Sequence, residues 1–168
     1  MLLNTFFGLC IQPKAQLTAG NNSTTVPDDL ELVLNSSNCD KESQSTQFMF
    51  TSDGRLQHIG TGRCVAPAAD PTNGNPPAVL KDCSEQDANS SSWQWTLTPE
   101  ASIQHRNSSK CLHPQGGQPS PGAVLHLHKG CGEERLQFMP TAPSKVPPSK
   151  ELEEHAELAA GLEMWTGR

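Results

Sequence analysis

The sequence lacks tyrosine and has few aromatic residues of any kind. Of its 168 residues, 5% are aromatic and 34% are hydrophobic. A hydrophobic core must therefore be small, built from aliphatic side chains with a few Phe and Trp residues. Long apolar runs are also missing, and none approaches the ~20 residues that a membrane-spanning helix needs. So thin a core needs reinforcement.

An excess of basic residues is absent too, since the net charge is −6. Nucleic acid or an anionic membrane would favour a basic face, so the charge argues against both as partners. The length allows one ordinary domain and a tail.

Three segments of the sequence resemble one another, and each contains one pair of cysteines. In each, an aliphatic residue stands eight positions before the first cysteine, and a Cys-aliphatic-x-Pro step follows: Leu2 with 10–13, Leu56 with 64–67, and Ile103 with 111–114. A short apolar stretch, the second cysteine and a Gln-aromatic pair complete each copy: Gln47-Phe48, Gln94-Trp95 and Gln137-Phe138. Repeats of about 45 residues occur in solenoids, propeller blades and closed pseudo-symmetric domains. Three copies of short strands favour the last.

The repetition predicts one disulfide within each copy: Cys10–Cys39, Cys64–Cys83 and Cys111–Cys131. Other connectivities are formally open. Each bridge would stabilise the fold by about 2–4 kcal/mol. The alternatives are free buried thiols and, less favoured because the sequence contains no Cys-x-x-Cys cluster, a metal site.

Disulfides indicate an oxidising compartment. Asn-x-Ser/Thr glycosylation sequons agree with this, and they lie at Asn21, Asn22, Asn35, Asn89 and Asn107. The first ten residues contain neither a basic segment nor a small-residue cleavage site, and they already fit the first repeat. We therefore expect a fragment or internal module of a larger secreted or ectodomain protein.

Apolar alternation with a period of two predicts short strands. It places Leu32, Leu34, Leu125 and Leu127 towards the core and His126 and His128 outward. Phe48/Phe50 and Trp93/Trp95 show the same alternation, and each pair precedes a turn signal. Four strands per repeat predict an all-β fold, a β-trefoil with a six-stranded barrel capped by three hairpins. An all-β sandwich is the alternative.

We expect the domain to cover residues 1–146, in repeats of about 1–55, 56–102 and 103–146. A degenerate closing strand would include Val146. Residues 147–168 read as a linker and an acidic tail, helical or disordered, with Ser149 as N-cap.

With one disulfide and one closing aromatic per repeat, residues 1 to about 146 resemble the R-type lectins, the ricin B-chain family of β-trefoils. The resemblance implies a sugar site with an Asp two residues after the first cysteine and an aromatic just before the second. This sequence has Gln12, Ala66 and His113 at the first of these positions, and no aromatic at the second. The family's Gln-x-Trp signature is also altered to an adjacent pair.

The third repeat also resembles galactose-binding lectin modules of marine invertebrates such as sea anemones. That resemblance implies a carbohydrate-binding module built around the loop His113-Pro114-Gln115-Gly116-Gly117. It also leaves room for a calcium ion that holds sugar hydroxyls.

The residues of the third repeat have a chemical rationale of their own. A Pro followed by two glycines allows a tight loop with accessible amides, while His113 and Gln115 offer donors and acceptors. His126 and His128 should lie on the strand beside it. The predicted carbohydrate site is therefore His113, Gln115, Gly116, Gly117, His126 and His128. We expect the side chains of His113 and His128 to lie outside the core. The alternative is a surface turn with solvated histidines.

Other ligand sites have weaker support. A second sugar site could involve Asp70, Asn73, Gly74 and Asn75 with Asp87 and Asn89. A zinc site from the three histidines lacks an evident carboxylate beside it. Calcium ligands would come from scattered loop residues: Asp70, Asn73, Asp87, Glu133 and Glu134.

Catalytic patterns are not found. No Gly-x-Ser-x-Gly motif or identifiable carboxylate pair occurs. We expect a non-enzymatic module without a resident cofactor, whose partners are glycans or glycoproteins. The rival is a structural, protein-binding or inhibitor trefoil that uses the insertion at 14–29.

Overall fold

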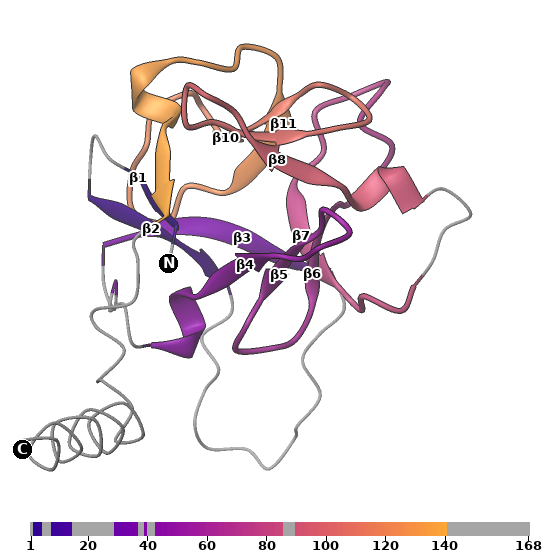
Figure 1. Ribbon diagram of the computed structural model, residues 1–168. Coiled ribbons are helices and arrows are strands. Elements are labelled where there is room, and N and C mark those ends of the chain that lie inside the picture. The colour runs from indigo at the N-terminus through magenta and orange to yellow at the C-terminus, as the bar shows by residue number, and fades with distance from the viewer. Residues whose placement is uncertain are drawn as a thin grey trace, which may run out of the picture.

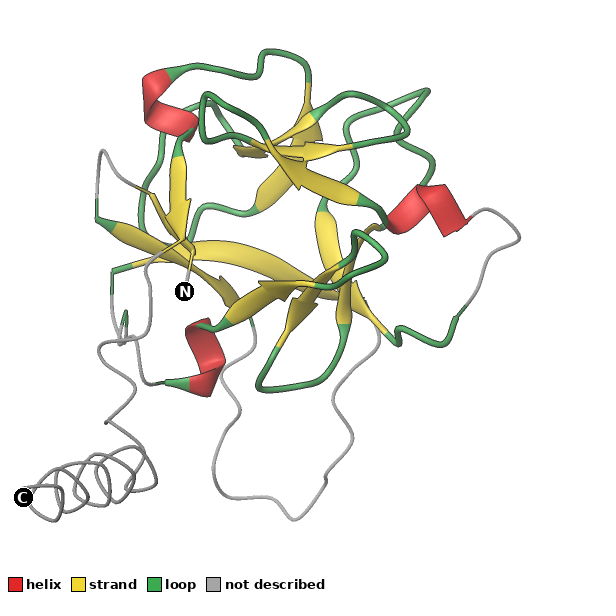
Figure 2. Cartoon of the chain, in the orientation of Figure 1, coloured by secondary structure: helices red, strands yellow, loops and turns green. Residues whose placement is uncertain are grey.

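The computed structural model describes residues 2–4, 8–14, 29–36, 39, 43–85 and 90–140. They form an all-β domain of short strands joined by turns and three short 3-10 helices (Figure 2). Within these ranges no helix is long and apolar enough to cross a membrane.

Each repeat contributes four strands, as the sequence predicts. The first repeat contains β1 (Leu2–Asn4), β2 (Leu9–Pro13), β3 (Leu30–Asn35) and β4 (Phe48–Phe50). The second contains β5 (Leu56–His58), β6 (Cys64–Pro67), β7 (Ala78–Lys81) and β8 (Trp95–Leu97). The third contains β9 (Ile103–His105), β10 (Cys111–Pro114), β11 (Leu125–His128) and β12 (Phe138–Pro140). The 3-10 helices η1 (Gln44–Thr46), η2 (Ser90–Trp93) and η3 (Glu134–Leu136) precede β4, β8 and β12.

Antiparallel pairing links these strands within and between repeats. Within each repeat the second and third strands form a hairpin: β2–β3, β6–β7 and β10–β11. Between repeats the last strand of one pairs with the first strand of the next: β4–β5, β8–β9 and β12–β1. The three repeats occupy successive sectors around a common centre (Figure 1). This arrangement is the predicted β-trefoil.

The fold closes through the pairing of its last and first described strands. β12 pairs with β1 in the register Leu2↔Pro140 and Asn4↔Phe138, so the described strands close the circle without a strand at Val146. Val146 and the tail lie outside the described residues. The boundary at 146 and the tail therefore stay predictions.

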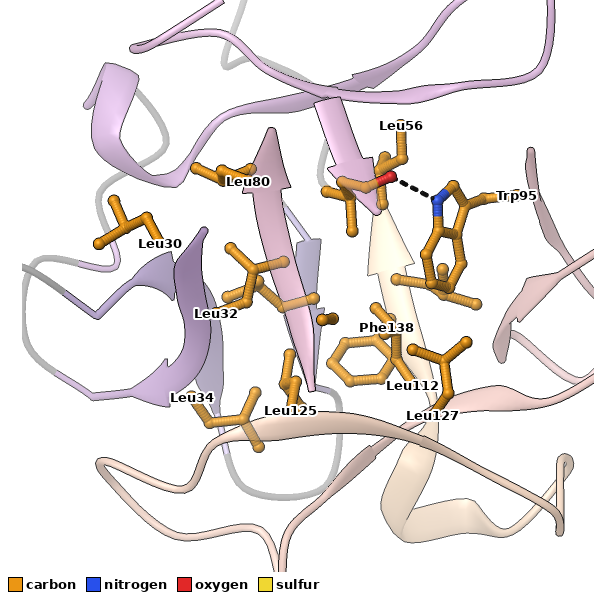
Figure 3. Packing of buried hydrophobic residues seen from close by; sticks show 14 of the residues in the cluster. Leu30, Leu32, Leu34, Leu56, Leu80, Trp95, Leu112, Leu125, Leu127 and Phe138 are labelled. Carbon is orange, nitrogen blue, oxygen red and sulfur yellow. Dashed lines mark hydrogen bonds between the residues drawn. The ribbon is translucent and has the colours of Figure 1, made fainter. Parts of the chain in front are cut away.

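The core is the thin aliphatic one that the composition predicts. Leucines from all three repeats surround the ring of Phe138 (Figure 3). Leu32, Leu34, Leu125 and Leu127 are each 0% exposed, which confirms that they face inward. Trp95 is also buried and donates its Nε1–H to the carbonyl of Val65 at 2.8 Å, so the only polar atom of its side chain is paired.

The three disulfides join the cysteines that the repetition paired: Cys10–Cys39, Cys64–Cys83 and Cys111–Cys131. Each closes a loop within its own repeat. Trp93 departs from prediction: it lies in η2 rather than alternating with Trp95 along a strand, and it packs on Cys64, Ala66 and Cys83.

Candidate carbohydrate site in the third repeat

The β10–β11 hairpin brings the three predicted histidines together. Its register pairs His113 with His126 and places His128 opposite Cys111. The ring centroids of His113, His126 and His128 are 5.1 to 6.0 Å apart. Leu112, Leu125 and Leu127 point to the other side of the hairpin, into the core. Because side chains alternate between the two faces of the hairpin, the three imidazoles lie together on the face opposite the core.

The three histidines are not equally accessible. His128 is exposed and His126 is half-buried, in agreement with their predicted outward orientation. His113 is only 6% exposed, so the expectation that it stands outside the packed interior is wrong. The rings of His126 and His128 lie against it, and it therefore forms the floor of the site rather than its rim.

Burial keeps the inner imidazoles neutral. Desolvation lowers the pKa of His113, and the nearby charges of His128 and Arg135 add to the effect. Desolvation also lowers the pKa of His126, with contributions from the two neighbouring histidines. A neutral imidazole has one donor and one acceptor nitrogen, which suits hydroxyl groups that both donate and accept.

His128 has a defined tautomer in this arrangement. Its Nδ1 contacts the carbonyl oxygen of Lys129, and a carbonyl can only accept. Nδ1 therefore carries the proton, which leaves Nε2 of the neutral ring as an acceptor.

The glycine pair forms a tight turn beside the hairpin. Gly116 and Gly117 have φ values of +80° and +79°, a left-handed conformation that favours glycine. The amide of Gly117 donates to the carbonyl of Pro114 at 2.9 Å. Gln115 is exposed at the tip, whereas Pro114 is buried.

Arg135 braces this turn, and the sequence analysis did not identify it. Its Nη1 donates to the carbonyl of Gly117, and its guanidinium forms an ion pair with Glu133, with Nη2 and Oε2 2.6 Å apart. Arg135 and Glu133 both act electrostatically on His113. Arg135 and Glu133 therefore link the Gly116–Gly117 turn to the face that carries the three histidines. The one available signal was their place in the segment just before Gln137-Phe138.

The corresponding positions of the other repeats have different chemistry. In the first repeat Gln12 lies opposite Val33, is nearly buried, and donates to the sulfur of Cys10 at 3.1 Å. In the second repeat Ala66 lies opposite Val79, and Trp93 packs on Ala66. Only the third of the three described hairpins carries polar groups on both strands at this place.

In the alternative loop of the second repeat, several polar groups are already hydrogen-bonded to other groups of the protein. The carboxylate of Asp70 accepts the amide of Thr72 at 2.9 Å, and this bond is the main reason that the pKa of Asp70 is lowered. The buried ammonium of Lys110 donates to the carbonyl of Gly74 and to Oδ1 of Asn75. Asp87 and Asn89 lie outside the described residues.

Metal binding finds no support in this part of the chain. The described residues contain no group of three or more His, Cys, Asp or Glu side chains that could hold a metal ion.

Solved structures with the same fold are numerous. A designed threefold symmetric protein, ThreeFoil, aligns with a TM-score of 0.62 at 16% identity, covering 82% of this chain and 93% of its own. The agglutinin of Abrus precatorius aligns with a TM-score of 0.60 at 16% identity, over 79% of this chain and 44% of the agglutinin chain. The C-half of the earthworm R-type lectin, solved with GalNAc, aligns with a TM-score of 0.60 at 9% identity, over 82% of this chain and 93% of its own. These likenesses establish the fold.

Family membership comes from the sequence. No curated protein matches this chain significantly. The family model of the ricin-type beta-trefoil lectin domain matches residues 7–138, most of the trefoil. The chain therefore belongs to the ricin-type beta-trefoil lectin domain family.

Proposed function

We propose that this chain is a non-catalytic carbohydrate-binding module that recognises galactose-type glycans through its third repeat. One observation carries the proposal: the β10–β11 hairpin gathers His113, His126 and His128 on one face, whereas the other two hairpins have Gln12 with Val33 and Ala66 with Val79 there. Membership in a lectin domain family agrees with this function.

The arrangement fits the chemistry of a sugar. Hydroxyl groups would be held by His126 and His128, with Gln115 and the amide of Gly116 at the edge of the site. The amide of Gly117 is already bonded to the carbonyl of Pro114, so Gly117 shapes the turn instead. Because Pro114 is buried, an imidazole ring must supply the flat face for the apolar side of the pyranose. His113 supports the two outer rings from below. Such a shallow site binds weakly, so useful avidity would need several modules or sites.

We further propose that the module works outside the cell, as part of a larger protein. The three disulfides suit an oxidising environment. Of the sequons, Asn107 lies exposed in the turn after β9, where a glycan could be attached, while Asn35 is half-buried in β3. Asn21, Asn22 and Asn89 lie outside the described residues.

Alanine substitutions at the two accessible histidines test the site. His126→Ala combined with His128→Ala should weaken binding to immobilised galactosides by about 10-fold or more, because each lost hydrogen bond is worth about 1 kcal/mol. Asn73→Ala, at an exposed position of the alternative loop in the second repeat, should bind like the wild type. His113 is left intact because its burial would mix binding with folding.

The outcomes separate the candidate functions. Loss of binding in Asn73→Ala with retention in the histidine variant would move the site to the second repeat. Absence of wild-type binding to every sugar of a glycan array would instead favour a structural, protein-binding or inhibitor domain. The insertion that could serve an inhibitor, residues 14–29, is described only at Lys14 and Asp29.

A further inference from the structure

A separate recess lies where the β4–β5 turn meets β8 and the turn after β9. Its volume is about 390 Å³, within the range of small-ligand pockets. Its lining includes Phe50, Ser52, Asp53, Trp95, Leu97 and Arg106. None of these residues belongs to the histidine site of the third repeat.

Hydrogen bonds between segments far apart in the sequence hold the recess open. The amide of Trp95 donates to the carbonyl of Gly54 at 2.8 Å, and the amide of Arg106 donates to the carbonyl of Gln94 at 2.9 Å. The side chain of Gln94 donates to the carbonyl of Asp53 at 3.1 Å. The three walls are therefore fixed in place before any ligand arrives.

One wall of the recess is apolar. Phe50 is 37% exposed, one of the few large hydrophobic residues at the surface of the described chain. Leu97 is half-buried beside the core, and the fully packed Trp95 lies at the base. The flat, partly accessible ring of Phe50 suits the apolar face of a pyranose.

The recess is also lined by a positively charged side chain, Arg106. The carboxylate of Asp53 is already engaged: Oδ2 lies 2.9 Å from Nε of Arg55, and Oδ1 accepts the hydroxyl of Thr51. Both contacts, the hydroxyl first, lower the pKa of Asp53. The guanidinium of Arg106 has no hydrogen-bond or ion-pair partner among the described residues.

Arg106 is nevertheless held close to the turn. Its Cζ lies 4.0 Å from the place where a β-carbon on Gly54 would stand. A guanidinium presents paired N–H donors that match carboxylate and sulfate oxygens. Phe50 and Arg106 thus present a ring face and an anion-binding group to the same recess.

We infer that this recess binds an acidic sugar, a pyranose bearing a carboxylate or a sulfate. The sugar ring packs on Phe50 while its anionic group pairs with Arg106, and Ser52 and Thr96 offer hydroxyls at the edge. A polyanion such as nucleic acid would need a row of cations. The lining of this recess has a single cation without a partner among the described residues, in a chain of net charge −6. The site is independent of the galactoside site and would be a second specificity of the same domain.

Matched probes without galactose test the inference. Methyl glucuronide and methyl glucoside differ by one carboxylate, and glucose 6-sulfate supplies the sulfate form. Titration of the full chain followed by amide NMR shifts should show the acidic sugars binding at least about 10-fold more tightly than the glucoside, because only they can form a charge-assisted hydrogen bond with Arg106. The largest shifts should fall on Ser52, Gly54 and Thr96.

Substitutions locate the charge that is recognised. Arg106→Gln should reduce glucuronide binding to the level of the glucoside, and Arg106→Lys should restore part of it. Lys129→Gln removes an exposed positive charge outside the recess and should bind like the wild type. Phe50→Ala should weaken both sugars.

Several results would overturn the inference. The first two are equal binding of glucuronide and glucoside, and equal effects of Arg106→Gln and Lys129→Gln on glucuronide binding. The third is a set of amide shifts centred on β10–β11. The fourth is binding of N-acetylphenylalanine as tightly as the glucuronide, because that compound has a ring and a carboxylate but no sugar. Methyl galactoside separates this inference from the galactoside proposal. It should lose affinity in His126→Ala/His128→Ala and keep it in Arg106→Gln.

Discussion

At the scale of single residues, two buried histidines perform the same task in neighbouring repeats. His58 ends β5 and His105 ends β9, and each packs on the aromatic residue of the preceding Gln-aromatic pair, with ring centroids 4.9 Å from Phe48 and 5.1 Å from Trp95. Each also binds two polar groups. Nε2 of His105 lies 2.6 Å from the carbonyl of Ser92, and Nδ1 lies 2.9 Å from the hydroxyl of Ser108.

The hydrogen bonds of His105 determine its tautomer. Because the carbonyl of Ser92 can only accept, Nε2 carries the proton and Nδ1 is the acceptor. The amide of Ser108 points to the same Nδ1 at 3.3 Å. The neutral ring therefore ties the turn after β9 to the segment that contains η2.

Replacing this ring with one of similar size isolates the hydrogen bonds. His105→Phe should lower the free energy of unfolding by about 1–3 kcal/mol, because it removes the hydrogen bonds that the imidazole makes with Ser92 and Ser108. Urea unfolding followed by fluorescence measures the change. His128→Phe, at an exposed position, is the control and should cost little; wild-type stability in His105→Phe would mean that packing alone holds this turn.

The positions of some residues in the site could be predicted from the sequence, and those of others could not. Alternation along a strand predicts that His126 and His128 share a face, because that relation is local. The burial of His113 depends on the two rings that cover it, which belong to the neighbouring strand. The contact of Lys110 with Asn75 joins residues 35 positions apart, and no local pattern marks it.

At the scale of elements, each repeat places a 3-10 helix just before its Gln-aromatic pair. The last residues of the three helices, Thr46, Trp93 and Leu136, are all buried. Trp93 is by far the largest, and it covers Ala66 and the Cys64–Cys83 disulfide. A tryptophan therefore fills the place in the second repeat that corresponds to the histidine site of the third.

Truncation of Trp93 should reveal how much η2 depends on this packing. Trp93→Ala should reduce the free energy of unfolding by about 3–5 kcal/mol, the usual cost of removing a buried aromatic side chain. Trp93→Leu, which introduces the residue type found at Leu136, should cost clearly less. Denaturant unfolding curves give both values, and equal losses for the two variants would show that the packing of the larger ring is unimportant.

The elements were predictable because their signals repeat. Each repeat contains an apolar residue, a cysteine pair and a Gln-aromatic pair, and these signals predict four strands and one disulfide per repeat. Where the pattern is weak in one repeat, the other two repeats still indicate the same structure. Trp93 was misplaced because a 3-10 turn and a strand can carry the same two-residue spacing of aromatics. The pairing of β12 with β1 was not apparent from local patterns, because the two strands lie at opposite ends of the described sequence.

At the scale of the whole molecule, stability comes from joining three weak units. The pairing of β3 with β7 and isolated bridges between Val33 and Val124 and between Pro77 and His126 link the hairpins of all three repeats. β12 and β1 close the ring. Each disulfide stays within one repeat, so contacts between repeats rest on hydrogen bonds and the shared leucine core.

The burial of histidines in this architecture predicts that mild acid lowers the stability of the molecule. Desolvation lowers the pKa of His58, His105, His113 and His126 below the ordinary value of 6.5. As the pH falls through 6.5, these histidines become protonated in the unfolded chain while they remain neutral in the folded chain. The unfolded state then binds more protons, so the free energy of unfolding decreases as the pH is lowered and is fully regained above about 7.5. The exposed Asp70 and Asp82, whose pKa values are lowered by hydrogen bonds from Thr72 and Ser84, add a further loss only below about pH 4.

Urea midpoints measured from pH 7.5 to 5 should therefore fall continuously, with each buried histidine contributing at most about 1.4 kcal/mol per pH unit. The double variant His58→Gln/His105→Gln cannot take up these protons. It should be less stable than the wild type at pH 7.5 yet lose less on acidification, so the two stability curves should approach each other as the pH falls. His128→Gln, which changes an exposed ring, should run parallel to the wild type. Parallel curves for the double variant and the wild type would exclude His58 and His105 as sources of the acid sensitivity.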